Sequence, residues 1–88
     1  MVSIIIPSYN SEAFIAATIT SVINQTHKNW ELIIVDDAST DCTCSIVSGF
    51  SEKNQRVKLI KQQKNVGAGV SRNVGIKAAK GSYIAFLD

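Results

Sequence analysis

The sequence predicts an α/β domain in which a parallel β-sheet is flanked by helices. Four short β-branched or aromatic runs alternate with three segments of helical periodicity, so strands and helices follow one another in strict alternation. The strand-like runs are almost continuously apolar, as expected where both faces of a parallel sheet are buried. The 88 residues, 45% hydrophobic and 18% charged, suit one folded domain and exclude disordered, collagen-like and disulfide-scaffold chains.

The first two elements follow from their apolar patterns. Residues 2–6 form a β-branched run that Pro7 ends, which predicts a buried strand. Residues 11–24 carry apolar pairs that recur four apart, which predicts a helix. Ser11 stands at the position of its N-cap.

A second strand and helix are expected next. Residues 30–35 predict another buried strand, which an acidic pair, Asp36 and Asp37, follows. Ser39 or Thr40 is expected to cap the second helix. One face of that helix is expected to carry Cys42, Ile46 and Phe50.

The last three elements complete the alternation. Residues 57–60 predict a shorter, more exposed strand, and residues 67–79 predict a third helix that Gly81 ends in a left-handed conformation. The aligned positions of that helix are Val70, Val74 and Ala78. Residues 83–87 predict a fourth buried strand. Because this strand runs to the last residue, we expect a fragment of a longer protein.

Polar residues follow the predicted strands at one edge of the sheet. In open parallel sheets, ligands bind beyond the carboxyl ends of the strands. The residues placed there are Ser8, Tyr9, Asn10, Asp36, Asp37, Ala38, Ser39 and Asp88. Carboxylates that converge on one edge repel one another unless a cation or hydrogen-bond donors lie between them. Asp36 or Asp37 could instead only cap the next helix, and Tyr9 could be a surface aromatic residue.

The segment NVGAGVSRN, residues 65–73, has features of an anion-binding helix start. Gly67 and Gly69 allow a tight turn and a close approach of the backbone to a ligand. The free amides of a helix N-terminus favour phosphate, and Arg72 adds a bidentate donor. The segment is neither a Rossmann fingerprint nor a Walker sequence. Arg72 could also be a simple surface cation.

Three segments resemble the N-terminal part of family 2 glycosyltransferases, which are inverting enzymes of the GT-A type. These segments are VSIIIPSYN, INQTHKNWELIIVDDASTD and NVGAGVSRNVGIKAAKGSYIAFLD, and they cover essentially the whole chain. Ala38 departs from the pattern because the family often has Gly there. The resemblance implies a Rossmann-like N-terminal half of a GT-A domain over residues 1–88, truncated at the DxD motif.

The resemblance also implies roles for individual residues. Tyr9 would lie against the nucleobase, Asp37 would accept the imide N–H of uracil, and Arg72 would contact the base or the diphosphate. Asp88 would be the first acidic residue of the DxD motif, which binds ribose and a divalent metal, Mg²⁺ or Mn²⁺. The nucleotide-binding set implied by the family is completed by Pro7, Asn10 and Gly67.

For the full-length protein, the resemblance implies transfer of a sugar from a nucleotide-diphosphate sugar, with UDP favoured, to an acceptor hydroxyl. The acceptor would be a glycan or a lipid-linked molecule in polysaccharide or cell-surface glycan synthesis. The family's general base lies beyond residue 88, so no catalytic residue is nominated, and this chain alone is expected to be inactive. The expected location is the cytoplasm, including the cytoplasmic face of the membrane.

Two other readings remain open at the level of sequence. The acidic pair after a buried strand is compatible with a receiver-like phosphoacceptor module. The chain could also be a non-catalytic half-domain that self-associates as a homodimer through exposed sheet surface. A net charge of +2 with scattered lysines does not indicate nucleic-acid binding. Cys42 and Cys44 are too close in sequence for an ordinary bridge and are expected to be reduced thiols.

Overall fold

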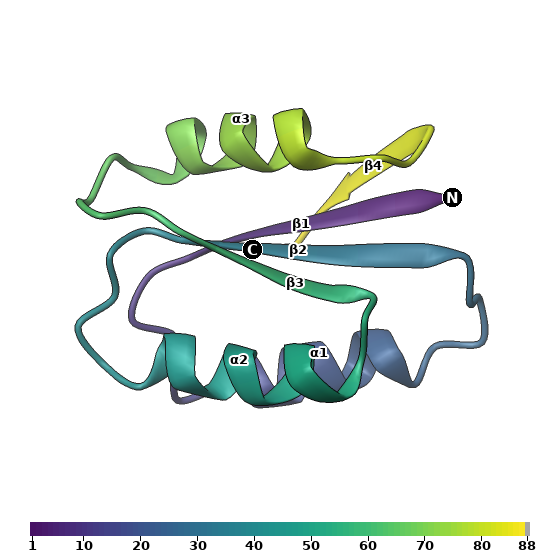
Figure 1. Cartoon of the computed structure of the whole chain (residues 1–88), viewed down its shortest axis with the longest axis horizontal. Helices are drawn as coiled ribbons and strands as arrows, with labels where there is room; N and C mark the ends of the chain where they lie inside the picture. The colour runs from purple at the N-terminus through teal and green to yellow at the C-terminus, as the bar shows by residue number, and fades with distance from the viewer. Residues whose placement is uncertain (88) are drawn as a thin grey trace.

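The computed structural model describes residues 1–87, which form the predicted alternation of strands and helices (Figure 1). The elements are β1 (Val2–Ser8), α1 (Ile15–Ile23), β2 (Trp30–Asp36), α2 (Thr43–Lys53), β3 (Val57–Lys61), α3 (Ala68–Ala78) and β4 (Tyr83–Phe86). No helix in this part of the chain is long and apolar enough to cross a membrane.

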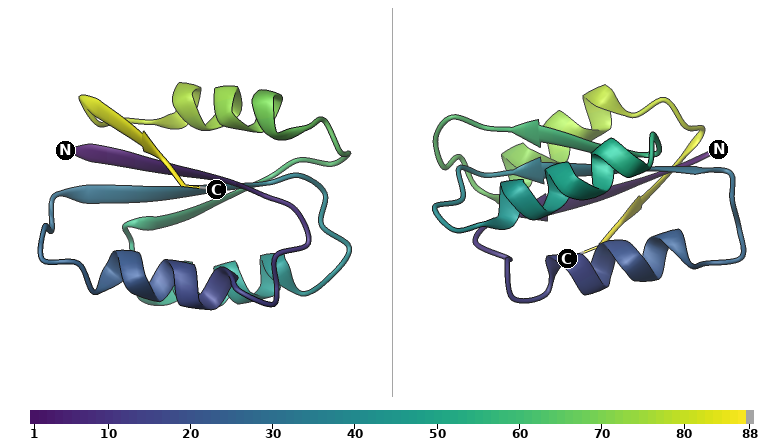
Figure 2. Two further views of the ribbon diagram at one scale, coloured as in Figure 1. Left: turned by 180° about the vertical axis from the view of Figure 1, so that it is seen from behind. Right: turned by 60° about the horizontal axis from the view of Figure 1, so that its bottom comes forward.

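The strands form one parallel sheet in the order β3-β2-β1-β4. Helices α1 and α2 cover one face, and α3 covers the other (Figures 1 and 2). The chain first builds outward from β1 to β3 and then returns through α3 to place β4 on the opposite side of β1. The strand order therefore reverses at β1, and such a reversal is where ligands bind in open α/β sheets.

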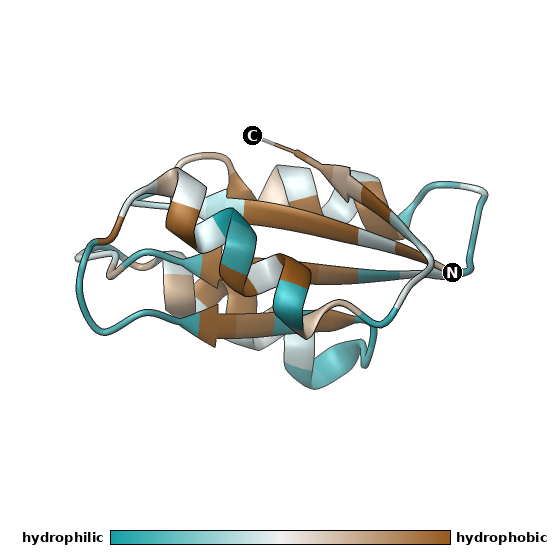
Figure 3. Ribbon diagram, turned by 90° about the horizontal axis from the view of Figure 1, so that it is seen from above, coloured by the Kyte–Doolittle hydropathy of each residue, from teal (hydrophilic) through white to brown (hydrophobic). Residues whose placement is uncertain are grey.

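The core consists of two layers because successive strand residues point to opposite faces. On the face of α1 and α2, the buried side chains include Ile4, Ile6, Ile19, Leu32, Ile34 and Val47. On the face of α3, the buried side chains are Ile5, Ile33 and Val35, with Val74 packed against them. Figure 3 shows the resulting apolar strands between more polar helices and loops. The fold class predicted from sequence is confirmed.

Strand β4 is exposed, so the prediction of a buried strand there was wrong. Tyr83, Ile84 and Phe86 are 72%, 41% and 45% exposed. The strand pairs with β1 along one edge, and no strand of residues 1–87 pairs with its other edge. Its apolar composition is therefore not matched by burial within the described chain.

Helix α1 begins at Ile15, and Ser11 is not its N-cap. The carbonyl of Ser11 accepts hydrogen bonds from the N–H groups of Phe14 and Ile15, while its hydroxyl donates to the carbonyl of Tyr9 at 3.4 Å. A turn over residues 12–14 therefore precedes the helix. The predicted apolar face is present through the buried Ile15, Ile19 and Val22.

Helix α2 begins at Thr43, later than a cap at Ser39 or Thr40 would place it. The N–H of Thr43 donates to the carboxylate of Asp41 at 2.9 Å, so an aspartate satisfies the first turn. Its buried residues are Thr43 and Val47, with Ile46 and Phe50 partly buried beside them. Cys42, which was predicted to lie on one face of this helix with Ile46 and Phe50, stands at its N-cap and is exposed.

Helix α3 buries a different face from the one predicted. Ser71 and Gly75 are its buried residues, whereas Val70 is 49% exposed. Ala78 is exposed as well, and only Val74 of the predicted set packs on the sheet. The small residues decide the face because α3 lies very close to the sheet: a Cβ on Gly75 would stand 2.5 Å from Cγ2 of Ile5.

Gly81 has no left-handed conformation, contrary to prediction, since Gly67 is the glycine with positive φ within residues 1–87. Gly81 is required for a close approach instead. Its N–H donates to Oγ of Ser3 at 2.8 Å, and an added Cβ would stand 2.5 Å from the carbonyl oxygen of Met1. This contact brings the start of β4 against β1.

Candidate functional site

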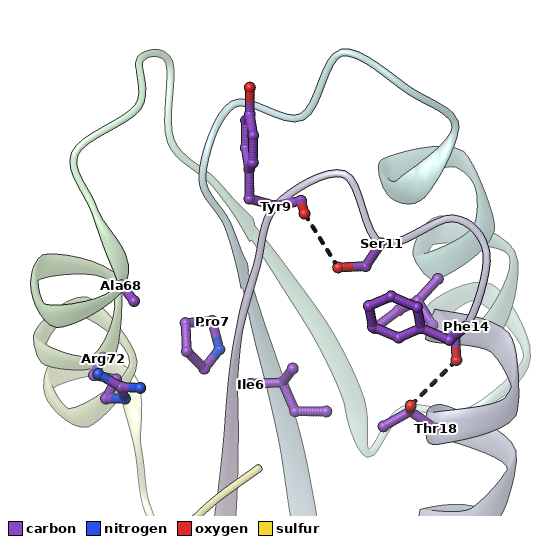
Figure 4. A pocket seen from close by; sticks show the side chains of 9 residues that line it. Ile6, Pro7, Tyr9, Ser11, Phe14, Thr18, Ala68 and Arg72 are labelled. Atoms are coloured by element: carbon purple, nitrogen blue, oxygen red, sulfur yellow. Dashed lines mark hydrogen bonds between the residues drawn. The ribbon is translucent and has the colours of Figure 1, made fainter. Parts of the chain in front are cut away.

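A pocket of about 340 Å³ lies beside the carboxyl half of β1; we name it the edge pocket. Strand β4 pairs with β1 only as far as Ile5, so the later residues of β1, which pair with β2 on one side, have no strand on their other side within residues 1–87. Figure 4 shows Ala68 and Arg72 of α3 on one side, Phe14 and Thr18 on the other, and β1 between them. The lining residues are Ile6, Pro7, Tyr9, Ser11, Phe14, Ile15, Thr18, Ala68 and Arg72.

Two aromatic rings form the outer wall of the edge pocket. Tyr9 and Phe14 are 50% and 57% exposed, an unusual exposure for large rings in so small a domain. A flat, exposed aromatic ring at a pocket mouth offers a stacking surface to another planar group. The geometry therefore suits a ligand that carries a ring.

A second, smaller pocket of about 70 Å³ adjoins Tyr9 and contains Asp37; we name it the Asp37 pocket. Asp37 is 5% exposed. Its Oδ1 accepts the N–H of Val66 at 2.7 Å, and its Oδ2 accepts the N–H of Gly67 at 2.9 Å. These bonds tie the end of β2 to the start of α3 and fix the carboxylate's orientation.

The two backbone bonds leave acceptor capacity on Asp37, because each carboxylate oxygen can accept more than one hydrogen bond. Gly67 has a φ of +93°, a conformation that residues with a side chain rarely adopt. Glycine at this position therefore allows the backbone turn that directs the amide toward the carboxylate. Asp37 is thus a preoriented acceptor inside a pocket whose rim is aromatic. It can receive an N–H group of a bound ring.

Asp36 has a structural task. It is 1% exposed, and its Oδ2 accepts the N–H of Ser39 at 2.9 Å while its Oδ1 accepts the hydroxyl of the same residue. These bonds close the loop between β2 and α2. Burial, together with a hydrogen bond to Asp36, raises the pKa of the Cys44 thiol to about 11, so Cys44 stays protonated at neutral pH.

Asn10 braces the loops behind the pockets. Its Oδ1 accepts the N–H of Thr40 at 2.9 Å, and its own N–H donates to Oγ of Ser39 at 2.9 Å. It lines neither the edge pocket nor the Asp37 pocket. The structure therefore gives Asn10 a supporting position at this edge.

The structure brings most of the predicted site residues together. Pro7 and Tyr9 line both pockets, Arg72 lines the edge pocket, and Asp37 lines its own. Gly67 contributes its amide to Asp37. Asp88 lies outside the described residues. Within residues 1–87, no group of three His, Cys, Asp or Glu side chains is placed to hold a metal ion.

Several lining residues were not nominated from sequence. Phe14 belongs to the apolar pairs of the helix predicted over residues 11–24, but the helix begins at Ile15, one residue after it. Ala68 carries no chemical signal. Ser8 and Ser71 are buried and line the Asp37 pocket, and their hydroxyls have no hydrogen-bond partner among the described residues. The sequence placed Ser8 at the carboxyl end of a predicted strand and Ser71 in the glycine-rich segment, but it gave neither hydroxyl a role.

The family model described as glycosyl transferase family 2 matches residues 3–88. The chain belongs to glycosyltransferase family 2. Among curated relatives, it is 49% identical over 88 residues to the Escherichia coli protein WfgD, named a UDP-Glc:alpha-D-GlcNAc-diphosphoundecaprenol beta-1,3-glucosyltransferase. That alignment covers all of this chain and 34% of WfgD, so the chain spans about one third of the relative.

Solved structures of the GT-A type share the fold. TarS 1–349 of S. aureus, solved in complex with UDP, superposes with a TM-score of 0.92 at 37% identity, over 99% of this chain and 26% of TarS. The mannosyltransferase PcManGT of Pyrobaculum calidifontis, solved with GDP-Man and Mn²⁺, gives a TM-score of 0.86 at 26% identity, over 94% of this chain and 25% of PcManGT. Membership of the family removes the basis for the receiver-like alternative.

Proposed function

We propose that residues 1–88 are the nucleotide-sugar-binding part of an inverting glycosyltransferase whose donor is a UDP-sugar. The observation that carries the proposal is the Asp37 carboxylate, which two backbone amides hold inside a pocket that it shares with the exposed ring of Tyr9. The UDP complex of TarS and the donor in the name of WfgD support the choice of nucleotide.

Each residue is assigned to a different part of the nucleotide. Tyr9 stacks on the base, and Asp37 accepts the imide N–H. Uracil presents that N–H between two carbonyl groups, whereas the corresponding ring nitrogen of adenine carries no hydrogen and cannot donate to a carboxylate. Arg72, on the far wall of the edge pocket, supplies a cation for the base or the diphosphate. Pro7 forms the floor between these groups, and Gly67 and Asn10 hold the surrounding loops.

In the full-length protein, we propose that the sugar passes to an acceptor hydroxyl of a glycan or lipid-linked molecule. The lipid-linked acceptor in the name of WfgD supports this class. No residue of this chain is proposed as the general base. We propose the cytoplasm, including the cytoplasmic face of the membrane, as the location; the free thiols of Cys42 and Cys44 are compatible with that compartment.

We also propose Asp88 as a ligand of Mg²⁺ or Mn²⁺ together with the nucleotide. The Mn²⁺ in PcManGT supports this proposal. When bound, a divalent ion would neutralise the negative charge of the leaving diphosphate.

Titration calorimetry with UDP, ADP and GDP tests the proposal. We expect UDP to bind most tightly of the three nucleotides. Asp37→Ala should weaken UDP binding by about 1.5–3 kcal/mol, roughly tenfold or more in affinity, because a hydrogen bond to a charged group is lost. Because Asp37 also holds the amides of Val66 and Gly67, Asp37→Asn is the control that keeps the side chain's size. Equal affinity of the wild-type chain for all three nucleotides would contradict the proposal.

A further inference from the structure

A third pocket, of about 380 Å³, lies at the opposite end of the sheet, where the strands begin; we name it the basic pocket. Four cationic side chains from segments far apart in sequence line it: Lys28, Arg56, Lys58 and Lys80. They come from the loop before β2, the turn before β3, β3 itself and the segment before β4. The basic pocket shares no lining residue with the edge pocket or the Asp37 pocket.

The carboxylate of the basic pocket, Glu31, is already satisfied. Glu31 is 2% exposed, and Oε1 pairs with Nζ of Lys58 at 2.7 Å. Its Oε2 accepts the hydroxyl of Ser3 at 2.6 Å and the backbone N–H of Lys80 at 2.6 Å. Glu31 therefore neutralises Lys58 and leaves the other three cations without a carboxylate among the described lining residues.

Trp30 belongs to the same lining and carries a buried donor without a partner in the described part of the chain. The residue is 2% exposed, and its Nε1 has no hydrogen-bond partner among residues 1–87. An indole N–H can only donate, and a buried donor without a partner is costly. The guanidinium of Arg56 lies 5.4 Å from the centre of the Trp30 ring, a cation–π distance that holds this charge beside the indole.

We propose that the basic pocket is a second ligand site, which binds a phosphate-type oxyanion such as a diphosphate group. The charged groups that remain uncompensated are donors, and they converge from separate segments on one concavity. A guanidinium group binds phosphate through paired N–H donors. The ammonium groups of the flanking lysines add positive charge and require no single orientation of the phosphate. Lys28 is restrained at the pocket because its Nζ donates to the carbonyl of Ile23 at 3.3 Å.

The chain provides its own reporter for this site, because Trp30 is its only tryptophan. We would titrate the ¹⁵N-labelled chain with inorganic pyrophosphate and follow the one indole N–H resonance. We expect a saturable shift of that resonance. Arg56→Ala and Lys28→Ala should each weaken the binding by about tenfold, as expected for loss of a charge-assisted hydrogen bond.

Lys64→Ala is the matched control, because it removes the same charge from the loop between β3 and α3, which leads to the nucleotide site. We expect it to leave the indole titration unchanged. Arg56 and Lys28 are exposed, and thermal melts of their variants check that the fold is intact. An equal loss in all three variants would show general charge attraction and overturn the proposal, as would an indole resonance that does not move.

A second arm distinguishes the source of the phosphate. Vesicles of phosphatidylglycerol are compared with vesicles of phosphatidylcholine in a flotation assay on the wild-type chain and Arg56→Ala. Binding that requires both the anionic lipid and Arg56 assigns the site to a lipid headgroup. Pyrophosphate binding without vesicle binding assigns it to a soluble phosphate compound. Without an indole shift on addition of pyrophosphate the site is rejected whatever the vesicles do, and neither result depends on whether UDP binds elsewhere.

Discussion

Asp36 and Asp37 are neighbours with different partners, and this difference explains why one folds a loop and the other is available to a ligand. Asp36 bonds within its own loop, to Ser39. Asp37 bonds to a distant segment, at Val66 and Gly67, and lines a pocket. Sequence reasoning could place the pair at the end of a strand, but it could not assign these tasks because the partners of Asp37 lie about 30 residues away.

The backbone at Ala38 gives the first prediction. Its φ is +62°, a left-handed conformation that costs a side-chain-bearing residue about 1 kcal/mol or more. Ala38→Gly should therefore raise the free energy of unfolding in urea by roughly 0.5–1 kcal/mol, after the larger entropy of the unfolded glycine is subtracted. Ala17→Gly, at an exposed position of α1, should lower the free energy of unfolding because glycine is a poor helix former. Destabilisation at both positions would contradict the strain at Ala38.

The second prediction concerns acid stability. Burial alone would raise the pKa of Glu31, but hydrogen bonds from Lys58, Ser3 and the N–H of Lys80 outweigh it and lower the pKa from 4.5 to about 2. Because the folded pKa is the lower one, the stabilisation is present above about pH 4.5 and is lost as the pH falls toward 2.

Lys58 is half-exposed, so solvent weakens its interaction with Glu31. The contribution of Glu31 to the free energy of unfolding should therefore be on the order of 2 kcal/mol. Urea titrations of the wild-type chain and Glu31→Gln between pH 2 and pH 7 measure it. The difference between the two proteins should be largest at neutral pH and shrink below pH 4.5. A difference that stays constant with pH would show that the charge of Glu31 contributes nothing.

At the scale of elements, local patterns predicted β1 and β2 well because both strands are buried on both faces and their composition is uniform. Helix faces and ends were harder to predict. The face of α3 is chosen by Gly75, whose missing side chain lets the helix approach Ile5. The first turn of α2 is satisfied by Asp41, a residue nearer to the helix than the caps that the sequence suggested.

Two helical glycines give the third prediction. Gly75→Ala should lower the free energy of unfolding by about 1–3 kcal/mol, because the added methyl would overlap the buried Ile5. Gly49→Ala, in α2, meets nothing within 4 Å and should raise it by about 0.5–1 kcal/mol through helix propensity. Urea unfolding measures both. Stabilisation by Gly75→Ala would show that α3 does not lie as close to the sheet as described.

For the whole molecule, the rule that ligands bind beyond the carboxyl ends of parallel strands predicted that Tyr9 and Asp37 would come together, and the family resemblance added Arg72. The structure places all three at one edge of the sheet. The rule could not supply Phe14 or Ser71, because their positions depend on where α1 starts and which side of α3 packs. Tertiary packing decides both.

The exposed strand β4 gives the fourth prediction. Its apolar residues and its unpaired edge invite pairing with a second copy, so we propose that the 88-residue chain self-associates in solution. Light scattering behind size exclusion should show a dimer or a larger species that Ile84→Lys shifts toward the monomer. Val70→Lys, at a comparably exposed apolar residue of α3, is the control. A monomer at every concentration would refute the proposal.

We propose that a uridine nucleotide binds where β1, β2 and α3 meet. An amide chemical-shift map of the ¹⁵N-labelled chain with increasing UDP tests it most directly. The N–H groups of Val66 and Gly67 bond to Asp37 and will report any ligand at that carboxylate. We predict that the largest shifts occur at these amides and at Tyr9 and Arg72. Shifts confined to the basic pocket, or no shifts at the amides of Val66 and Gly67 at saturation, would contradict the claim.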